Sequence, residues 1–252
     1  MTPIRLAIWS GPRNLSTAMM RSFGARADCA VSDEPFYANY LATSGVTHPM
    51  QDEIIAAHEA DPDKVIAHLT GPVPGGKAIW YQKHMPQHLY LPNVRRDWLG
   101  SMRHAFLIRA PERVVASFDA KRPSPSLEDI AVPQMDRLDA ELTALTGAPP
   151  VVFEAEDVRA NPEGMLRALC AALDVPFDPA MLSWPRGPRA TDGVWAKHWY
   201  KAVEDSTGFA PPPGPPDDLA PGLAAGLAEV AAAARPSFER LQARKLAPLA
   251  SA

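Results

Sequence analysis

The feature that most constrains the fold is the N-terminal segment from Ile4 to Met20. Its apolar run ends in Ser10-Gly11-Pro12-Arg13, and a helical pattern opens directly behind it with Ser16 and Thr17 in the first turn. A buried strand that leads through a tight loop into a helix directs free backbone N–H groups and the positive helix end towards one point. Arg13, Ser16 and Thr17 add side-chain donors there. The segment therefore predicts a phosphate site at the start of an α/β domain.

The same loop also allows a simpler interpretation. Asn14 or Ser16 can serve only as the N-cap of the helix, because both residue types accept hydrogen bonds from the first backbone N–H groups. The loop lacks the Gly-Lys pair that precedes Ser/Thr in a Walker A motif. Taken alone, the loop leaves phosphate binding and plain capping both open.

Further apolar segments along the chain are predicted as strands, and helical patterns lie between them. Strands that alternate with helices favour a mainly parallel sheet covered on both faces, which is a doubly wound arrangement. A chain of 252 residues is long enough for one such domain or two smaller ones, and we expect a single domain over residues 1–252. After the first strand, the predicted strands are residues 29–32, 77–83, 104–109 and 150–154.

Helix boundaries follow from caps and prolines. Asp61 before Pro62 and Asn161 before Pro162 are each predicted as the N-cap of a helix with Pro at its first position. A longer helical stretch is predicted from Leu127 to Leu145. The Pro-rich residues 211–216 are predicted as an extended connector to a C-terminal Ala-rich helical segment, which we expect to be interrupted near Pro236.

Several polar residues fall at the ends of predicted strands. They are the loop at Gly11, the turn Asp33-Glu34, the turn Lys83-His84, and Arg109. In open parallel sheets the ligand site lies outside the carboxyl ends of the strands. These residues are therefore predicted to converge on one site.

Composition and charge exclude some classes of protein. The formal net charge of −4 argues against a general nucleic-acid coat or a polybasic membrane binder. The sequence shows no membrane-spanning run, no signal-peptide pattern and two cysteines without motif spacing, so we expect a cytoplasmic protein. His, Cys and carboxylate residues show no metal-ligand spacing, so we expect no metal.

Two segments together resemble a known enzyme family. The loop Pro12-Arg13-Asn14-Leu15-Ser16-Thr17 stands where that family has Pro-Arg/Lys-Ser-Gly-Ser/Thr-Thr, and Arg109 with Ser117 matches its second motif, including the intervening Pro111. The family is that of the sulfotransferases that use 3′-phosphoadenosine 5′-phosphosulfate (PAPS). In this chain Asn14-Leu15 replaces the usual Ser-Gly. The segment from Phe153 to Phe177 is similar to the family's late strand-and-helix signature, which is mainly structural.

The resemblance extends from Ile4 to about Phe177 and implies a P-loop NTPase-like three-layer sandwich. It implies that Arg13, Asn14, Ser16 and Thr17 bind the 5′-phosphosulfate. By the same resemblance Arg109 and Ser117 bind the 3′-phosphate, and Arg186 stands near the family's C-terminal 3′-phosphate clamp. A surface role for Arg109 is the alternative, although an Arg that closes an apolar strand is well suited to an anion, which it binds through two N–H groups.

Two residues are candidates for the base that activates the acceptor hydroxyl. Glu34 resembles the glutamate that some bacterial members carry at the end of the second strand, and burial can raise the pKa of a carboxyl group towards the range of a base. His84 in His84-Met85-Pro86 resembles the His-Leu-Pro of cytosolic members. Lys83 is expected to stabilise the sulfuryl oxygens or the leaving phosphate. The structural alternatives are a helix-terminal charge for Glu34 and a satisfied loop histidine for His84.

The sequence therefore predicts a sulfotransferase that moves a sulfuryl group from PAPS to a hydroxyl of a small-molecule acceptor, without nucleic acid or metal. One alternative is a nucleotide-dependent kinase on the same fold, which the absent Gly-Lys pair disfavours. Another is a non-catalytic nucleotide-binding descendant, which the Leu at position 15 leaves open because it replaces a glycine. Neither the acceptor nor the oligomeric state follows from the sequence.

Overall fold

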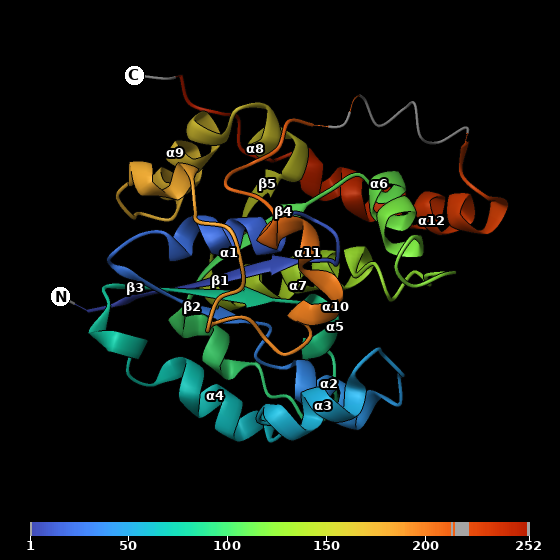
Figure 1. Cartoon of the computed structure of the whole chain (residues 1–252), viewed down its shortest axis with the longest axis horizontal. Coiled ribbons are helices and arrows are strands. Elements are labelled where there is room, and N and C mark those ends of the chain that lie inside the picture. Colours follow the sequence, from blue (N-terminus) through green and yellow to red (C-terminus); the bar gives the residue numbers. More distant parts are fainter. Residues whose placement is uncertain (1, 213, 215–221, 251–252) are drawn as a thin grey trace.

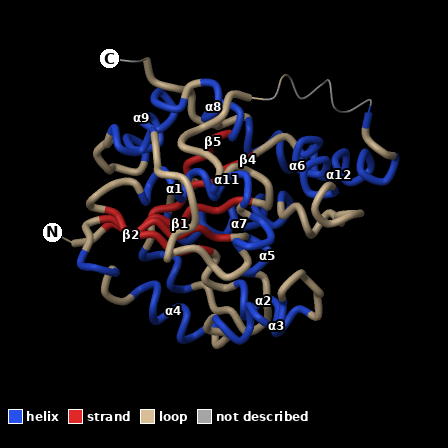
Figure 2. Tube along the Cα trace, in the orientation of Figure 1, coloured by secondary structure: helices blue, strands red, loops and turns tan. Residues whose placement is uncertain are grey.

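The computed structural model describes residues 2–212, 214 and 222–250. Its strands form one sheet in the order β2–β3–β1–β4–β5, and every neighbouring pair is parallel. This confirms the five predicted strands and the parallel sheet (Figures 1 and 2). The strands are β1 (Ile4–Ser10), β2 (Cys29–Asp33), β3 (Ile79–His84), β4 (Arg103–Ile108) and β5 (Val151–Glu154).

Helices fill most of the connections between the strands and the C-terminal part. None of those in the described part is long and apolar enough to cross a membrane. The α-helices are α1 (Ser16–Gly24), α2 (Tyr37–Ser44), α3 (Gln51–Ala57), α4 (Pro62–Thr70), α5 (Pro86–Leu89), α6 (Pro111–Asp119), α7 (Val132–Thr146), α8 (Ala155–Ala160), α9 (Pro162–Ala172), α10 (Ala196–Trp199), α11 (Lys201–Glu204) and α12 (Ala225–Gln242). Short 3₁₀ turns are η1 (Pro74–Gly76), η2 (Asp97–Ser101) and η3 (Pro179–Leu182).

The sheet is the middle of three layers (Figure 1). Side chains alternate along β1, so Ala7 and Trp9 belong to one apolar core while Leu6 and Ile8 belong to the other. Helices α4, α6, α7 and α12 cover the first face, and α1, α8 and α9 cover the second; α2 and α3 add Tyr37, Leu41 and Ile54 to the second core. The three-layer, P-loop-like architecture expected from the sequence is therefore confirmed.

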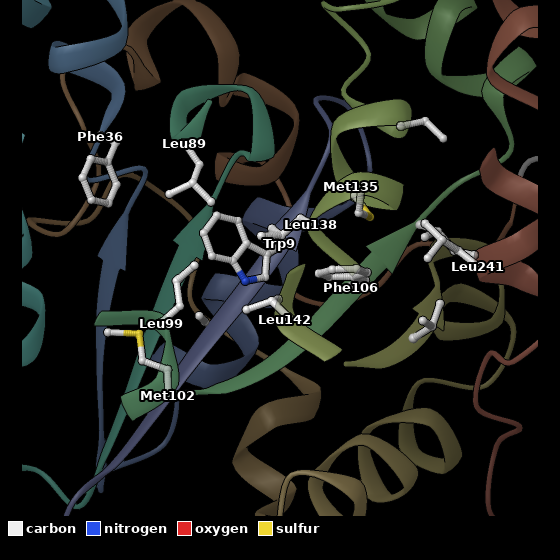
Figure 3. Packing of buried hydrophobic residues seen from close by; sticks show 14 of the residues in the cluster. Trp9, Phe36, Leu89, Leu99, Met102, Phe106, Met135, Leu138, Leu142 and Leu241 are labelled. Carbon is white, nitrogen blue, oxygen red and sulfur yellow. The ribbon is translucent and has the colours of Figure 1, made fainter. Parts of the chain in front are cut away.

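Trp9 is at the centre of the first core. Its neighbours across the sheet are His84 of β3 and Phe106 of β4. Figure 3 shows its indole beside Leu138 and Leu142 of α7. The ring of His84 stacks on it with centroids 4.6 Å apart, so this face of the sheet is filled to the end of β3.

The capping predictions are confirmed. Asp61 accepts a hydrogen bond from Asp63 N at 3.0 Å at the start of α4, and Asn161 accepts one from Gly164 N at 3.0 Å at the start of α9. The helix predicted from Leu127 begins instead at Val132. Side-chain and backbone hydrogen bonds between Ser126 and Asp129 hold the chain in a turn just before it.

The predicted interruption near Pro236 is wrong, because α12 runs unbroken through this residue. Tertiary contacts account for this: Phe238 and Leu241 are buried in the first core, and Arg235 pairs with Glu112 of α6. Of the predicted connector 211–216, residues 213, 215 and 216 lie outside the described residues.

Replacing Pro236 by Ala should raise the free energy of unfolding by about 1–3 kcal/mol, because it restores a helical N–H donor and removes the ring from the helix interior. Urea denaturation monitored by circular dichroism measures this change. The matched control is Pro72→Ala in a loop, which should leave stability unchanged or slightly lower. A destabilised Pro236→Ala variant would contradict the continuous helix.

Candidate functional site

A cavity of about 330 Å³ opens at the carboxyl ends of the strands. Its walls come from the loop after β1, from the ends of β2, β3 and β4, and from the C-terminal segment that carries α10 and α11. The residues predicted for the site that line this cavity are Arg13, Asn14, Ser16, Thr17, Glu34, Lys83, Arg109 and Ser117. Strand ends far apart in the sequence thus meet where the topology predicts.

The loop between β1 and α1 has an unusual backbone. Arg13 and Leu15 both adopt positive φ, at 61° and 68°. Leu15 is the N-cap of α1 and provides no side-chain hydrogen bond, so the interpretation of Asn14 or Ser16 as a plain cap is wrong. Leu15 thus holds a left-handed conformation, at a cost of about 1–2 kcal/mol, at the position where the motif that the loop resembles has glycine.

The remaining contacts of the loop support a ligand role. Asn14 is buried, donates its Nδ2 to the carbonyl of Leu107 at 3.4 Å, and leaves Oδ1 without a partner among the described residues. Gly11 is required by packing, since a Cβ there would lie 2.4 Å from the carbonyl oxygen of Ile130. The start of α1 therefore offers backbone N–H groups, without a side-chain cap, to an anion.

Arg13 and Ser117, predicted for two different phosphate groups, touch each other. Arg13 Nε donates to Ser117 Oγ of α6 at 3.0 Å, and Arg109 donates to the backbone carbonyl of Arg13 at 2.8 Å. Arg109 also pairs with Glu156 at 2.9 Å. Burial lowers the pKa of Arg13, and the neighbouring charge of Arg109 lowers it further. Two arginines that repel each other in a cavity are suited to binding an anion.

On the opposite side, Lys83 forms a buried polar cluster. Its Nζ donates to Asp33 Oδ1 at 2.8 Å, to Glu34 Oε1 at 2.6 Å and to Tyr200 Oη at 2.6 Å. Tyr200 in turn donates to the Asp33 carboxylate, whose oxygens lie 2.8 Å away, and Gly193 N donates to Asp33 Oδ2 at 3.1 Å. Every N–H of the ammonium thus faces an oxygen atom.

Charges in this cluster set each other's pKa. Burial raises the pKa of Glu34, and the ammonium of Lys83 opposes that rise without cancelling it. For Lys83 itself, burial lowers the pKa, but Asp33 and Glu34 outweigh it and the net pKa is raised well above the ordinary value. Glu34 also holds a positive φ of 41°, a strained conformation of the kind found at functional sites. The cluster therefore holds a charged lysine beside a carboxylate of increased basicity.

Two predicted residues are not brought to the cavity. His84 is buried between the rings of Trp9, Phe36 and Trp98, and its Nε2 lies 3.2 Å from Gln82 Oε1. It points into the first core because side chains alternate along β3, which sends Lys83 to the site instead. Arg186 is exposed and does not line the cavity.

The sequence assigned no role of their own to three residues that line the cavity or hold its cluster, although Asp33 was placed at the site with Glu34. Asp33 anchors Lys83 and Tyr200, and the pair Asp33-Glu34 at a strand end was the available signal. Tyr200 and Arg159 come from the C-terminal segment and from α8, and only the fold brings them to the site. Rings of Tyr37, Tyr40 and His88 pack in a stack that forms the wall beside Glu34; other cavity-lining rings are His48, Phe118, Trp195 and Trp199.

Comparison with known proteins agrees with this geometry. The family model described as "Sulfotransferase domain" matches residues 4–245, so the chain belongs to the sulfotransferase family. Branched-chain-amino-acid aminotransferase-like proteins 1 and 2 of Arabidopsis thaliana are 38% and 36% identical to it over 81% of this chain. The chain spans 36% of the length of each of these relatives.

A solved structure extends the comparison to the fold. The sulfotransferase from Alicyclobacillus acidocaldarius superposes with a TM-score of 0.55 at 15% identity, covering 98% of each chain. This likeness concerns the arrangement of strands and helices. The family match and this structural likeness agree on a sulfotransferase fold for the chain.

The buried histidines predict a loss of stability in acid. Burial lowers the pKa of His84 to about 3 and that of His104 and His48 to about 4, below the value of about 6.5 in an unfolded chain. The unfolded state therefore takes up these protons first. The contribution of these histidines to the free energy of unfolding is therefore fully present above pH 6.5. It falls towards pH 4 by up to about 1.4 kcal/mol for each histidine and each pH unit.

Urea denaturation at several pH values between 7.5 and 4.5 measures this slope. The variant His84→Phe keeps an aromatic ring beside Trp9 and removes one titrating group. Its free energy of unfolding should therefore change less steeply with pH, by the uptake of about one proton fewer on unfolding. Equal slopes for the two proteins would show that His84 is not held neutral in the core.

Proposed function

We propose that this protein transfers the sulfuryl group of PAPS to a hydroxyl of a small-molecule acceptor. The observation that carries the proposal is the division of one cavity into two charged halves. Arg13, Arg109 and the uncapped start of α1 form an anion-binding half, while Lys83 and Glu34 form a half suited to proton removal. PAPS requires this combination, because it carries two separate phosphate groups and a transferable sulfuryl group.

In the proposed complex the 5′-phosphosulfate lies against the start of α1. Backbone N–H groups of the first turn and the hydroxyls of Ser16 and Thr17 lie at the cavity there. Arg109 and Ser117 bind the 3′-phosphate, and Arg13 lies between the two groups because it contacts Ser117 while its carbonyl accepts from Arg109. The arginines bind the phosphates through charge-assisted hydrogen bonds.

In the transfer step Glu34 accepts the proton of the acceptor hydroxyl. The acceptor oxygen forms a bond to sulfur while the bond from sulfur to the 5′-phosphate oxygen breaks, which leaves 3′,5′-adenosine bisphosphate. The positive charge of Lys83 stabilises the charge that develops on the sulfuryl and phosphate oxygens. We prefer Glu34 to His84 as the base because Glu34 lines the cavity and His84 lies in the core. No part of this step calls for a metal.

The acceptor half favours a small molecule with apolar surface. Tyr37, Tyr40 and Trp195 present rings beside Glu34, and Met85 and Val203 add aliphatic surface. The acceptor shares this one cavity with the donor, so we expect a small acceptor.

Nucleotide selectivity tests the proposal directly. We expect 3′,5′-adenosine bisphosphate to raise the melting temperature more than ADP or Mg-ATP does, because only the bisphosphate occupies both arginine-rich positions. Thermal shift with each nucleotide at equal concentration measures this. An equal response to the bisphosphate and to Mg-ATP would favour a kinase, and no response to any of them would contradict the proposal.

Replacing Glu34 by Gln should lower the rate of sulfate transfer by at least about 100-fold while affinity for the bisphosphate stays within about twofold. Transfer from radiolabelled PAPS to a panel of small alcohols and phenols gives the rate, and calorimetry gives the affinity. In the wild type the rate should rise with pH through the pKa of Glu34, which burial places above its ordinary value. His84→Asn is the control. If His84 were the base, the His84→Asn variant would lose the transfer rate and the Glu34→Gln variant would keep it.

A further inference from the structure

Arg159, at the end of α8, is the one arginine of the cavity wall whose role is unassigned. Its side chain is half-buried, and its Nη1 reaches the carbonyl oxygens of Ala210 and Pro211 only at 3.3 and 3.4 Å. Hydrogen bonds of this length are weak. Its Nε is buried without a hydrogen-bond partner among the residues that the structure describes. The guanidinium group of Arg159 at the cavity wall therefore makes only weak hydrogen bonds within the described part of the protein.

The charges around Arg159 make its position costly without a ligand. Arg13 and Arg109 line the same cavity, and Glu156 is the sole carboxylate that pairs with any of these three arginines in the described part of the chain. Glu156 already forms ion pairs with Arg109 at 2.9 Å and with Arg113 at 3.6 Å. Burial lowers the pKa of Arg159, Arg109 and Arg113 lower it further, and the charge of Glu156 offsets this only in part. Like charges at this density favour an anion with more than one negative charge.

Strand order indicates which end of the nucleotide this anion belongs to. The loop after β1 is central in the sheet, with Glu34 directly after β2 and Lys83 near the end of β3 on one side. Arg109 follows β4 on the other side, and α8 with Arg159 follows β5 beyond it. Arg159 thus lies on the same side of the first loop as Arg109, away from the half of the cavity that holds Glu34 and Lys83.

From this arrangement we infer that Arg159 is a binding residue for the 3′-phosphate and determines the preference for a bisphosphate nucleotide. The inference rests on the proposed function. Arg159 exchanges its long contacts with the Ala210 and Pro211 carbonyls for charge-assisted hydrogen bonds to phosphate oxygens. It supplies the cation that the sequence led us to expect from Arg186, which is exposed outside the cavity.

The test compares two probes, 3′,5′-adenosine bisphosphate and 5′-AMP, which differ only in the 3′-phosphate. Calorimetry should show that Arg159→Gln weakens binding of the bisphosphate by about 10- to 100-fold and changes 5′-AMP by less than twofold. Arg159→Lys should retain part of the preference, since a lysine keeps the charge but loses the planar fork. The control is Arg167→Gln on α9, which pairs with Glu163 outside the cavity and should alter neither affinity.

Stability without ligand separates binding from a structural role. The melting temperature of Arg159→Gln should equal or exceed that of the wild type, because the change removes a charge that repels Arg109. Equal weakening of both probes, unchanged affinity for the bisphosphate, or a lowered melting temperature with loss of both probes would overturn the inference. A wild-type protein that binds the two probes equally would instead contradict the proposed function.

Discussion

The half of the site that holds Glu34 depends on the contacts of the buried ammonium group of Lys83. A charge this far from water is stable only when hydrogen bonds and opposite charges surround it, and here Asp33, Glu34 and Tyr200 do so together. Because Asp33 and Glu34 end β2 and Tyr200 belongs to the C-terminal segment, the cluster also joins that segment to the sheet. Removal of one partner from such a group typically costs about 3–5 kcal/mol. The same contacts thus maintain the cavity wall and the orientation of Glu34.

The other half of the cavity shows the opposite balance. Lys83 has more negative partners than its own charge requires, whereas among Arg13, Arg109 and Arg159 only Arg109 pairs with a carboxylate, that of Glu156, within the described residues. Negative charge is in excess near β2 and β3, and positive charge is in excess near β4 and β5. The two ends of the cavity therefore differ in charge. In the proposed complex the two phosphates of the donor lie on the positive side, with the reactive end towards Glu34. Strand order β2–β3–β1–β4–β5 produces this separation, since it divides the strand ends between two sides of the first loop.

Much of this organisation could be predicted from the sequence because it depends on local patterns. Apolar runs gave all five strands, and residues at their ends gave Glu34, Lys83, Arg109 and the loop with Arg13. Predictions failed where long-range contacts outweigh local preference. Pro236 lies inside a helix because that helix is packed against α6 and α7, and Leu15 keeps a left-handed backbone that glycine normally provides.

What the sequence by itself determined is the set of elements, their parallel arrangement and the charged residues placed at the strand ends, because periodicity and caps act within a few residues. Only the tertiary structure decided which of these side chains share the cavity. The alternation along β3 directs Lys83 to the site and His84 into the core, a choice that depends on which face packs against Trp9. Likewise, Tyr200 and Arg159 reach the cavity through contacts between segments distant in the chain, which no local pattern specifies.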